Sequence, residues 1–250
     1  MHISAILLDL HNTITKHLYS PLKLLVEITG EFGVDLSSFK DTELNEAFEK
    51  SDRWFKQEQL NNNVGPHWGQ EPRHWLNANR IMFESLGVTD LDNDVILMIE
   101  NQWHEKVSSS EFEILADDIL ETLKELRKRN YLLGICTRRT ISPDSLLKSH
   151  RIDKYFESVQ WSGVIGYAKP SPYTLIMAAK ELGVNPRKCA MVGNYVNADV
   201  EAAKRAGMLP VLLTWANPDE AEKAEKGTIV LESPKELLQL FKGPDIEIPN

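Results

Sequence analysis

The residues best suited to chemistry in this chain each follow a short apolar run. Asp9 follows the first run, Thr137 follows the second, and the pair Gly193-Asn194 follows a third. A carboxylate placed just past a buried strand is costly unless a cation or metal ion pairs with it, and an aspartate can attack phosphorus to form an aspartyl-phosphate. Groups placed in this way are typical of covalent phosphoryl transfer.

Further groups complete the candidate site. Lys169 lies in a segment with two prolines just before an expected helix, where its ammonium could neutralise both the nucleophile and the transferred phosphoryl group. Thr13 and Thr137 offer hydroxyls to a phosphate oxygen, although threonine is also an ordinary turn and strand residue. Asn194 offers an amide oxygen to a metal ion. Asp199 could fix the loop or orient Lys169, although an acid in the first turn of a helix is common.

An alternation of apolar runs and helical patterns must position these groups. We expect strands at Ile3–Leu8, Tyr131–Cys136, Ser158–Trp161, Cys189–Val192, Leu209–Thr214 and Thr228–Leu231. We expect helices to begin near Asp117, Ser142, Ser171, Asn197 and Ser233, the last with a capping box. This pattern predicts an α/β fold with three layers around a parallel, Rossmann-like sheet. Such a sheet binds ligands at the carboxyl ends of its strands.

A long helical block interrupts the alternation after the first strand. Residues 17–110 show helical periodicity, contain four of the six tryptophans and show no strong strand pattern. We therefore expect a core domain made of residues 1–16 and 111–250, with residues 17–110 inserted as a helical-bundle cap. The cap should set substrate choice. The candidate residues for that role are Trp54, His67, Trp68, Arg73, His74 and Trp75.

Composition narrows the class of protein. The 250 residues are 42% apolar, and the net charge of −9 argues against a nucleic acid or an anionic membrane as partner. The two cysteines, Cys136 and Cys189, are expected to be core thiols rather than a disulfide. No apolar run is long enough to span a membrane, and the first residues lack the basic leader of a signal peptide. We expect a cytoplasmic protein, either a monomer or a homodimer.

Taken in order, these motifs resemble those of the haloacid dehalogenase-like (HAD) superfamily, in its helical-cap (C1, subfamily IA-like) branch. The first family motif, Asp-x-Asp-x-Thr, maps onto residues 9–13, and the second, a hydroxyl residue that ends a strand, onto Thr137. The third maps onto Lys169 with its following proline. The fourth, Gly-Asp with a later Asp, maps onto Gly193-Asn194 and Asp199. The similarity extends from residue 1 to about residue 241.

The resemblance implies a role for each of these positions. Asp9 would be the nucleophile and Lys169 the electrostatic clamp, while Thr13 and Thr137 would bind phosphate. Mg²⁺ would be held by Asp9, by the main-chain carbonyl of His11 and by the side chain of Asn194. The substrate would be a small phosphorylated metabolite, and Asp199 would support the site.

Two of the family positions are substituted. His11 stands where phosphatases of the family carry a second aspartate, which protonates the leaving alcohol and then activates water; an imidazole can perform either step at neutral pH. Asn194 stands where the family usually has aspartate, so an oxygen ligand is kept but a charge is lost. One unit charge at ~4 Å is worth about 4 kcal/mol at an effective dielectric of 20, so Mg²⁺ should bind more weakly.

Arg138 or Arg139 could supply part of the missing positive charge to a phosphate, although a solvated basic turn is the simpler interpretation.

Three functions are consistent with the sequence. The first is a Mg²⁺-dependent phosphatase that cleaves a small phosphomonoester through an aspartyl-phosphate. The second is a weakly active or inactive member that binds a ligand or a protein, because both substitutions touch the metal and acid–base positions. The third is a metal-free 2-haloacid dehalogenase, since such enzymes also lack the second aspartate, although no cap arginine stands out for a substrate carboxylate.

Overall fold

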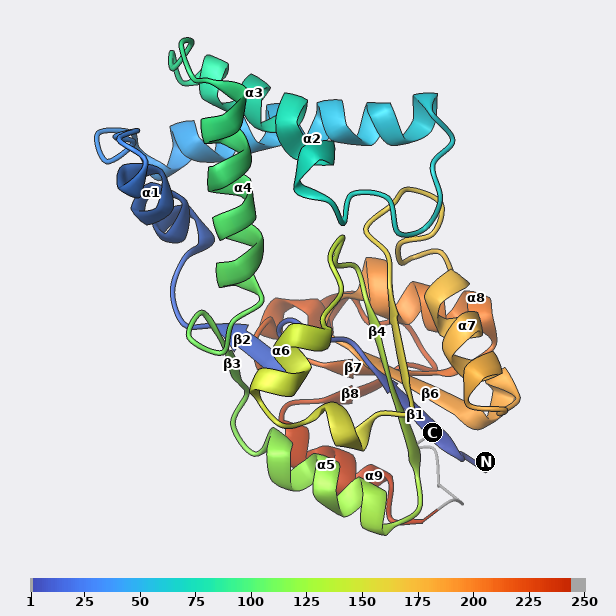
Figure 1. Ribbon diagram of the computed structural model, residues 1–250. Coiled ribbons are helices and arrows are strands. Elements are labelled where there is room, and N and C mark those ends of the chain that lie inside the picture. Colours follow the sequence, from blue (N-terminus) through green and yellow to red (C-terminus); the bar gives the residue numbers. More distant parts are fainter. Residues whose placement is uncertain (1, 244–250) are drawn as a thin grey trace.

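A six-stranded parallel sheet forms the centre of the molecule in the computed structural model, which describes residues 2–243 (Figure 1). Its strands run in the order β5-β4-β1-β6-β7-β8. Their bounds are β1 Ala5–Leu8, β4 Leu132–Thr137, β5 Ser158–Trp161, β6 Cys189–Gly193, β7 Leu209–Leu213 and β8 Ile229–Leu231. β1 and β6 are buried along their whole length, which explains why they read as continuous apolar runs. The predicted strands are confirmed to within two residues at each end.

Helices cover both faces of the sheet and give the predicted three layers. The helices of the core are α5 Ile119–Lys128, α6 Asp144–Ser149, α7 Tyr173–Glu181, α8 Glu201–Ala206 and α9 Leu237–Leu240. Alternate residues of β1 point to opposite faces: Ile6 and Leu8 pack in the cluster under α5, α6 and α9, whereas Ala5 and Leu7 pack under α7 and α8. Because every strand pair in this sheet is parallel, the carboxyl ends of all its strands lie at one edge.

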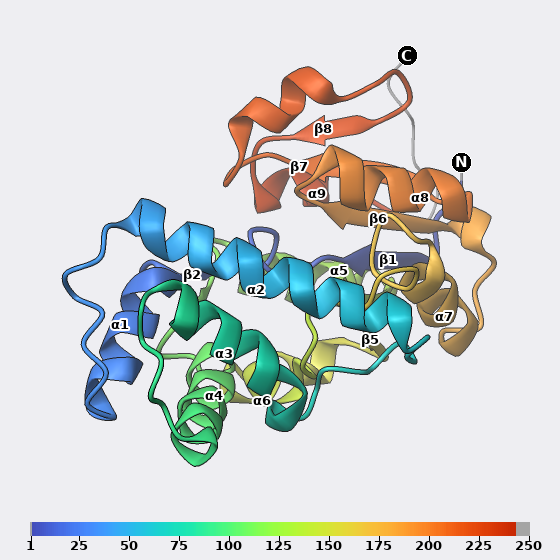
Figure 2. The ribbon, with the colours of Figure 1, turned by 90° about the horizontal axis from the view of Figure 1, so that it is seen from above.

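The cap is a bundle of four α-helices that stands over this edge of the sheet (Figures 1 and 2). Its helices are α1 Pro21–Glu31, α2 Asp41–Asn61, α3 Leu76–Ser85 and α4 Asn93–Val107, with a 3₁₀ turn at Pro72–Trp75. Leu24, Ile28, Phe83 and Ile96 belong to its own apolar core. None of the helices described in residues 2–243 is long and apolar enough to cross a membrane.

A short antiparallel ribbon joins the cap to the core, and we call it the hinge ribbon, or hinge. β2 (Thr15–His17) pairs with β3 (Glu113–Leu115), so that Thr15 faces Leu115 and His17 faces Glu113. The sequence patterns did not predict this ribbon, because strands of three residues are too short to show an alternation. It brings the two chain connections of the cap together next to the loop that follows β1.

Two local predictions need correction. The helix expected from Asn197 begins with one wide turn of π-helix at Val196–Val200 before α8. At Ser233 the predicted capping box is absent from the described contacts: its hydroxyl donates to the Glu236 carboxylate at 2.8 Å instead of capping a main-chain N–H. Cys136 and Cys189 are buried and free, as expected.

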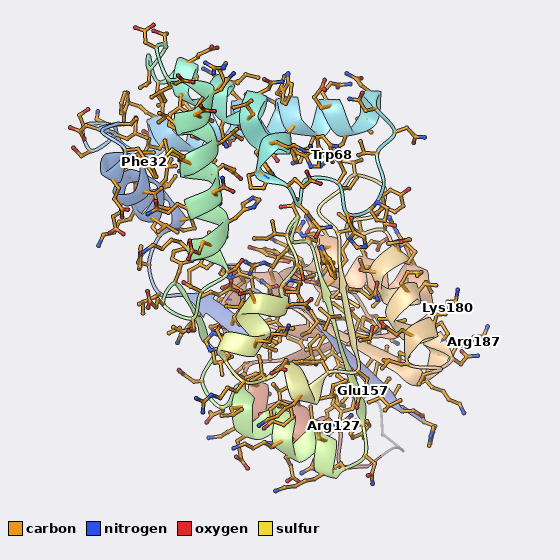
Figure 3. The ribbon with its side chains drawn as sticks, viewed as in Figure 1. Phe32, Trp68, Arg127, Glu157, Lys180 and Arg187 are labelled. Atoms are coloured by element: carbon orange, nitrogen blue, oxygen red, sulfur yellow. The ribbon has the colours of Figure 1, made fainter. Side chains whose placement is uncertain are left out.

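Labelled side chains mark the cap side and the far end of the core (Figure 3). Trp68 lies on the side of the cap that faces the core, in the segment between α2 and α3. Arg127 of α5 and Glu157, just before β5, form an ion pair at the end of the core away from the cap.

Candidate functional site

A buried lysine joins two carboxylates at the carboxyl ends of the central strands. The ammonium Nζ of Lys169 lies 2.6 Å from Oδ1 of Asp9 and 2.5 Å from Oδ1 of Asp199, and it also donates to the carbonyl of Cys136 at 2.7 Å. Only 1% of the Lys169 side chain is exposed. The predicted meeting of Asp9 and Lys169, which lie 160 positions apart, is therefore confirmed.

The backbone around these groups explains their positions. The N–H of Asp9 continues the ladder and donates to the carbonyl of Val192 in β6 at 2.8 Å. Asp199 lies in the π-helical turn, and its Oδ2 accepts the main-chain N–H groups of Asn194 and Tyr195 at 3.1 and 3.0 Å. A Cβ at Gly193 would lie 2.2 Å from Cγ of Asp199, so only glycine lets this carboxylate reach Lys169.

Burial and charge perturb these groups in opposite ways. Burial raises the pKa of Asp9 above its ordinary value and outweighs the lowering effect of Lys169, while Asp199 adds to the rise. For Lys169, burial acts to lower the pKa, but Asp199 and Asp9 together outweigh it and leave the pKa raised. The Lys169 ammonium therefore stays charged between the two carboxyl groups.

Thr13 and Asn194 lie together beside this trio. The hydroxyl Oγ1 of Thr13 donates to Oδ1 of Asn194 at 3.4 Å, and both side chains are fully buried. The amide nitrogen Nδ2 of Asn194 has no hydrogen-bond partner among residues 2–243, which is costly for a buried polar atom. An aspartate at position 194 would have a second carboxylate oxygen where Asn194 has Nδ2. A group bound beside this atom would therefore meet an N–H donor instead of an oxygen.

The remaining predicted phosphate-binding residues differ in position. Thr137 is buried at the carboxyl end of β4, directly after the Cys136 carbonyl that Lys169 contacts. Arg138 is exposed, and its guanidinium lies over the ring of Tyr195 at 5.8 Å. Within residues 2–243, Arg138 makes no hydrogen bond or ion pair with Asp9 or Lys169.

Arg139 is not part of a solvated basic turn. Its guanidinium donates to Oε2 of Glu113 at 2.5 Å and to the carbonyl of Val107 at 2.8 Å, and only 14% of its side chain is exposed. It pairs with a buried acid of the hinge and therefore does not supply free positive charge to a phosphate. These contacts correct both interpretations of Arg139, as a solvated basic residue and as a free cation for a phosphate.

His11 lies between the site and the hinge ribbon. Its Nδ1 is 3.6 Å from Oε1 of Glu113, and its ring lies beside the ring of His17, tilted by 31° with 3.8 Å between centroids. Glu113 is completely buried and also accepts the hydroxyl of Thr15. The His11 side chain is 37% exposed, so one part of the ring reaches solvent while Nδ1 stays buried.

The two partners of His11 have strongly shifted pKa values. Burial alone would raise the pKa of Glu113, but His11 and Arg139 outweigh it and hold this pKa at about 2. Burial, with a smaller effect from His11, lowers the pKa of His17 to about 4. At neutral pH, Glu113 is therefore an anion and His17 a neutral imidazole.

A cavity of about 290 Å³ lies inside the cap, above the loop that follows β4. Its walls are mainly aromatic and aliphatic, and its polar side holds Glu100, which accepts from Asn79 at 2.6 Å and pairs with His104 at 2.8 Å. Arg139 lines it from the core. Asp9, Lys169 and Asp199 do not line it.

Of the six cap residues proposed from the sequence, only Trp75 lines this cavity. Trp68 packs on Phe55 and His74, His67 packs on Trp161, and Arg73 is 71% exposed and paired with Glu71. The sequence patterns did not identify two residues of the hinge ribbon and two on the polar side of the cavity. These are His17, Glu113, Glu100 and His104. A weak signal existed, since Glu113 is a lone acid in an apolar run and Glu100 and His104 have helical i, i+4 spacing.

Comparisons with known proteins agree with this geometry. A family profile described as haloacid dehalogenase-like hydrolase matches residues 3–207. The chain is 30% identical over 129 residues to a glyceraldehyde 3-phosphate phosphatase of Methanopyrus kandleri, which covers 50% of this chain and 55% of that protein. It is 26% identical over 192 residues to a phosphoglycolate phosphatase of Shigella boydii, covering 72% of both. The chain thus spans little more than half the length of the first curated relatives that it matches.

Solved structures with this fold carry diverse names. A putative β-phosphoglucomutase of Thermotoga maritima superposes with a TM-score of 0.67 at 19% identity, over 96% of this chain and 99% of that one. A 2-haloacid dehalogenase of Pseudomonas syringae superposes with a TM-score of 0.66 at 18% identity, over 95% and 97%. At such identities the likeness establishes the fold and leaves the reaction to be argued from the site.

Proposed function

The chain belongs to the haloacid dehalogenase-like hydrolases, and from that premise we propose that it is a phosphatase that cleaves a small phosphomonoester through an aspartyl-phosphate on Asp9. The observation that carries the proposal is the buried Lys169 ammonium held between Asp9 and Asp199 at the carboxyl edge of the sheet. A cation fixed beside a nucleophilic carboxylate lowers the repulsion that an incoming phosphate dianion would meet. The phosphatase names of the curated relatives support the same reaction class.

In the first step, a carboxylate oxygen of Asp9 attacks phosphorus and the bond from phosphorus to the alcohol oxygen breaks. His11 gives a proton to the departing alcohol, which leaves as a neutral product. In the second step, water attacks the aspartyl-phosphate while His11 takes up its proton, so inorganic phosphate leaves and Asp9 is regenerated. Lys169, Thr13 and Thr137 hold the phosphoryl oxygens through both steps.

Glu113 has a positioning role in this scheme. Its ionised carboxylate faces Nδ1 of His11 and is itself fixed by Thr15 and Arg139. At 3.6 Å this carboxylate makes no hydrogen bond to Nδ1, but its negative charge favours the tautomer that carries its proton on Nδ1. The other ring nitrogen is then free for proton transfer to the leaving group.

The residues around Asp9 fit a hard divalent cation such as Mg²⁺. The Asp9 carboxylate, the His11 main-chain carbonyl and the Asn194 amide oxygen would hold the ion, all three being oxygen donors of the kind that Mg²⁺ prefers. The Asn194 side chain is buried, and its Oδ1 accepts from the Thr13 hydroxyl at 3.4 Å. When bound, the ion would neutralise charge on the phosphoryl group. Because Asn194 brings no charge, we propose that affinity for Mg²⁺ is lower than an aspartate would give.

A panel of phosphomonoesters assayed with and without Mg²⁺ tests the proposal, with release of inorganic phosphate as the measurement. We expect Mg²⁺-stimulated turnover of at least one substrate, and Asp9→Asn should abolish it because the amide cannot form the acyl phosphate. Halide release from 2-haloacids without Mg²⁺ would instead assign a dehalogenase.

A second candidate is a binding protein of the same fold that has lost turnover. It is favoured by the substitution at both His11 and Asn194, which affects the acid–base and metal positions together. Calorimetry separates the two: absent Mg²⁺ binding and no turnover across the panel would support the second candidate. Gain of turnover in the double variant His11→Asp with Asn194→Asp would show that these two positions alone disabled the site.

A further inference from the structure

Three side chains of types that can bind metal ions meet at the hinge between core and cap. They form a group different from the oxygen donors around Asp9. His11 comes from the loop after β1, His17 from β2 and Glu113 from β3. One ligand atom of each can be chosen so that all three lie within 4.8 Å of one another. Among residues 2–243 no other group of three such side chains reaches this spacing.

The buried ring nitrogen of His11 points to a missing partner. Nδ1 is buried and has no hydrogen-bond partner within the described part of the chain, although Oε1 of Glu113 lies 3.6 Å away. That separation is too long for a hydrogen bond. It is close to the roughly 3.4 Å expected between two ligands of a tetrahedral zinc ion whose bonds to nitrogen and oxygen are about 2.0–2.1 Å. A metal ion between the two atoms would satisfy the buried nitrogen.

The chemistry of the ligands selects the class of metal. Two imidazoles with one carboxylate suit borderline-soft ions such as Zn²⁺ and Co²⁺, whereas Mg²⁺ prefers oxygen ligands. We propose that His11, His17 and Glu113 form a binding site for a divalent transition-metal ion of the Zn²⁺ class at the hinge. Three protein ligands leave a fourth position for water or for a ligand group.

The surroundings of Glu113 limit the strength of this site and orient it. Arg139 and Thr15 both donate to the Glu113 carboxylate, which fixes its direction as outer partners of metal ligands commonly do. The positive charge of Arg139 also opposes a cation nearby. The expected affinity is therefore lower than that of a structural zinc finger.

Metal binding here would have a consequence for the site around Asp9. The ion would tie the loop that carries His11 to both strands of the hinge ribbon and would occupy a nitrogen of the His11 ring. Zn²⁺ would then inhibit turnover measured in excess Mg²⁺, an expectation that rests on the proposed function. The binding itself does not depend on it.

Titration of the 250-residue chain with Co²⁺ tests the site directly, because tetrahedral Co²⁺ with nitrogen and oxygen ligands absorbs visible light. We expect one Co²⁺ per chain, a visible band that Zn²⁺ abolishes by displacement, and a loss of affinity of at least tenfold in both His17→Ala and His17→Asn. Asp9→Asn should keep the band, which separates this site from the oxygen donors around Asp9. His67→Ala, which removes an exposed cap histidine, is the matched control and should bind as the wild type does.

Two results would overturn the proposal: no visible band with stoichiometric Co²⁺, or a band and Zn²⁺ affinity that both His17 variants leave unchanged while circular dichroism shows them folded. Failure of the phosphatase proposal would give a different pattern. In that case Co²⁺ would still bind through His17, and only the phosphate-release assays would be negative.

Discussion

Lys169 is the residue on which both the stability and the chemistry of the site depend. It is almost fully buried and is the cation that two buried carboxylates share. A buried ion pair of this kind contributes little net stability compared with an apolar core, but removing one partner leaves the other charge uncompensated. The effect of its removal on folding can therefore be separated from the effect on catalysis.

Lys169→Met should abolish turnover and lower the free energy of unfolding by about 3–5 kcal/mol, because Asp9 and Asp199 remain buried without their cation. Urea unfolding followed by tryptophan fluorescence measures the second effect. Adding Asp199→Asn to Lys169→Met removes one of the stranded charges, so it should restore part of the stability and none of the activity. Equal stability of the single and double variants would contradict the shared-cation interpretation.

Gly193 is needed for a steric reason that concerns Asp199. Gly193→Ala would place a methyl group 2.2 Å from Cγ of Asp199 and force the π-helical turn away from Lys169. We expect a loss of about 1–3 kcal/mol in unfolding free energy, the usual cost of overpacking, together with loss of turnover. Gly30→Ala is the control: Gly30 lies exposed in α1 with no atom within 4 Å of an added Cβ, so alanine should stabilise by about 0.5 kcal/mol. Chemical denaturation of both variants gives the comparison.

At the level of elements, the hinge ribbon is the feature that links folding to pH. Glu113 of β3 has a folded pKa of about 2, below its ordinary value. Its unfolded form therefore binds protons more readily, and its contribution to stability is present above the ordinary pKa and is lost as pH falls toward 2. A shift of this size corresponds to about 3 kcal/mol.

Glu113→Gln should therefore flatten the acid limb of the stability profile. Between about pH 4.5 and pH 3, the wild type should lose stability more steeply than the variant, while at pH 7 the variant should be the less stable because Arg139 loses its anion. Urea midpoints measured across this range test the difference. Glu111→Gln, which changes an exposed acid two residues away, should reproduce the wild-type slope.

The elements also show what sequence patterns can and cannot predict. β1 and β6 were predictable because strands buried on both faces are continuous apolar runs. The convergence of Asp9, Lys169 and Asp199 was predictable because parallel strands present their carboxyl ends at one edge. The ribbon of β2 and β3 was not, since its three-residue strands carry no periodicity. Its buried Glu113 depends on a partner, Arg139, that lies 26 positions away.

At the scale of the whole molecule, the cap and core are joined by more than the hinge. Gln59 near the end of α2 accepts the main-chain N–H of Ile165 at 3.0 Å, and the Ser162 hydroxyl donates to the carbonyl of Pro66 at 2.7 Å. These contacts lie on the opposite side of the interface from the ribbon of β2 and β3 (Figure 1). They hold the cap over the carboxyl edge of the sheet, so the cavity inside it is shaped by both domains.

This arrangement also explains why the substrate does not follow from the relatives. The first curated relatives align over about half of this chain. The cavity is lined by cap side chains such as Phe48, Trp75 and Trp103, and few of the positions that decide its shape could be identified from sequence periodicity alone. A helix pattern shows which residues are apolar, and it does not show which of them leave a space between helices.

Gln59→Ala should loosen the second connection between cap and core without disturbing the hinge. The substitution removes the acceptor of the Ile165 N–H, and a typical hydrogen bond contributes about 1 kcal/mol net, so the amide of Ile165 should exchange with solvent about fivefold faster. Hydrogen–deuterium exchange of a peptide covering residues 162–167 measures this change. Gln57→Ala removes an exposed glutamine of the same helix that bonds only within the helix, and it should leave that peptide unchanged. If both variants exchanged alike, the Gln59 contact would not help to hold the cap on the core, and the hinge and the bond from Ser162 to Pro66 would have to do so without it.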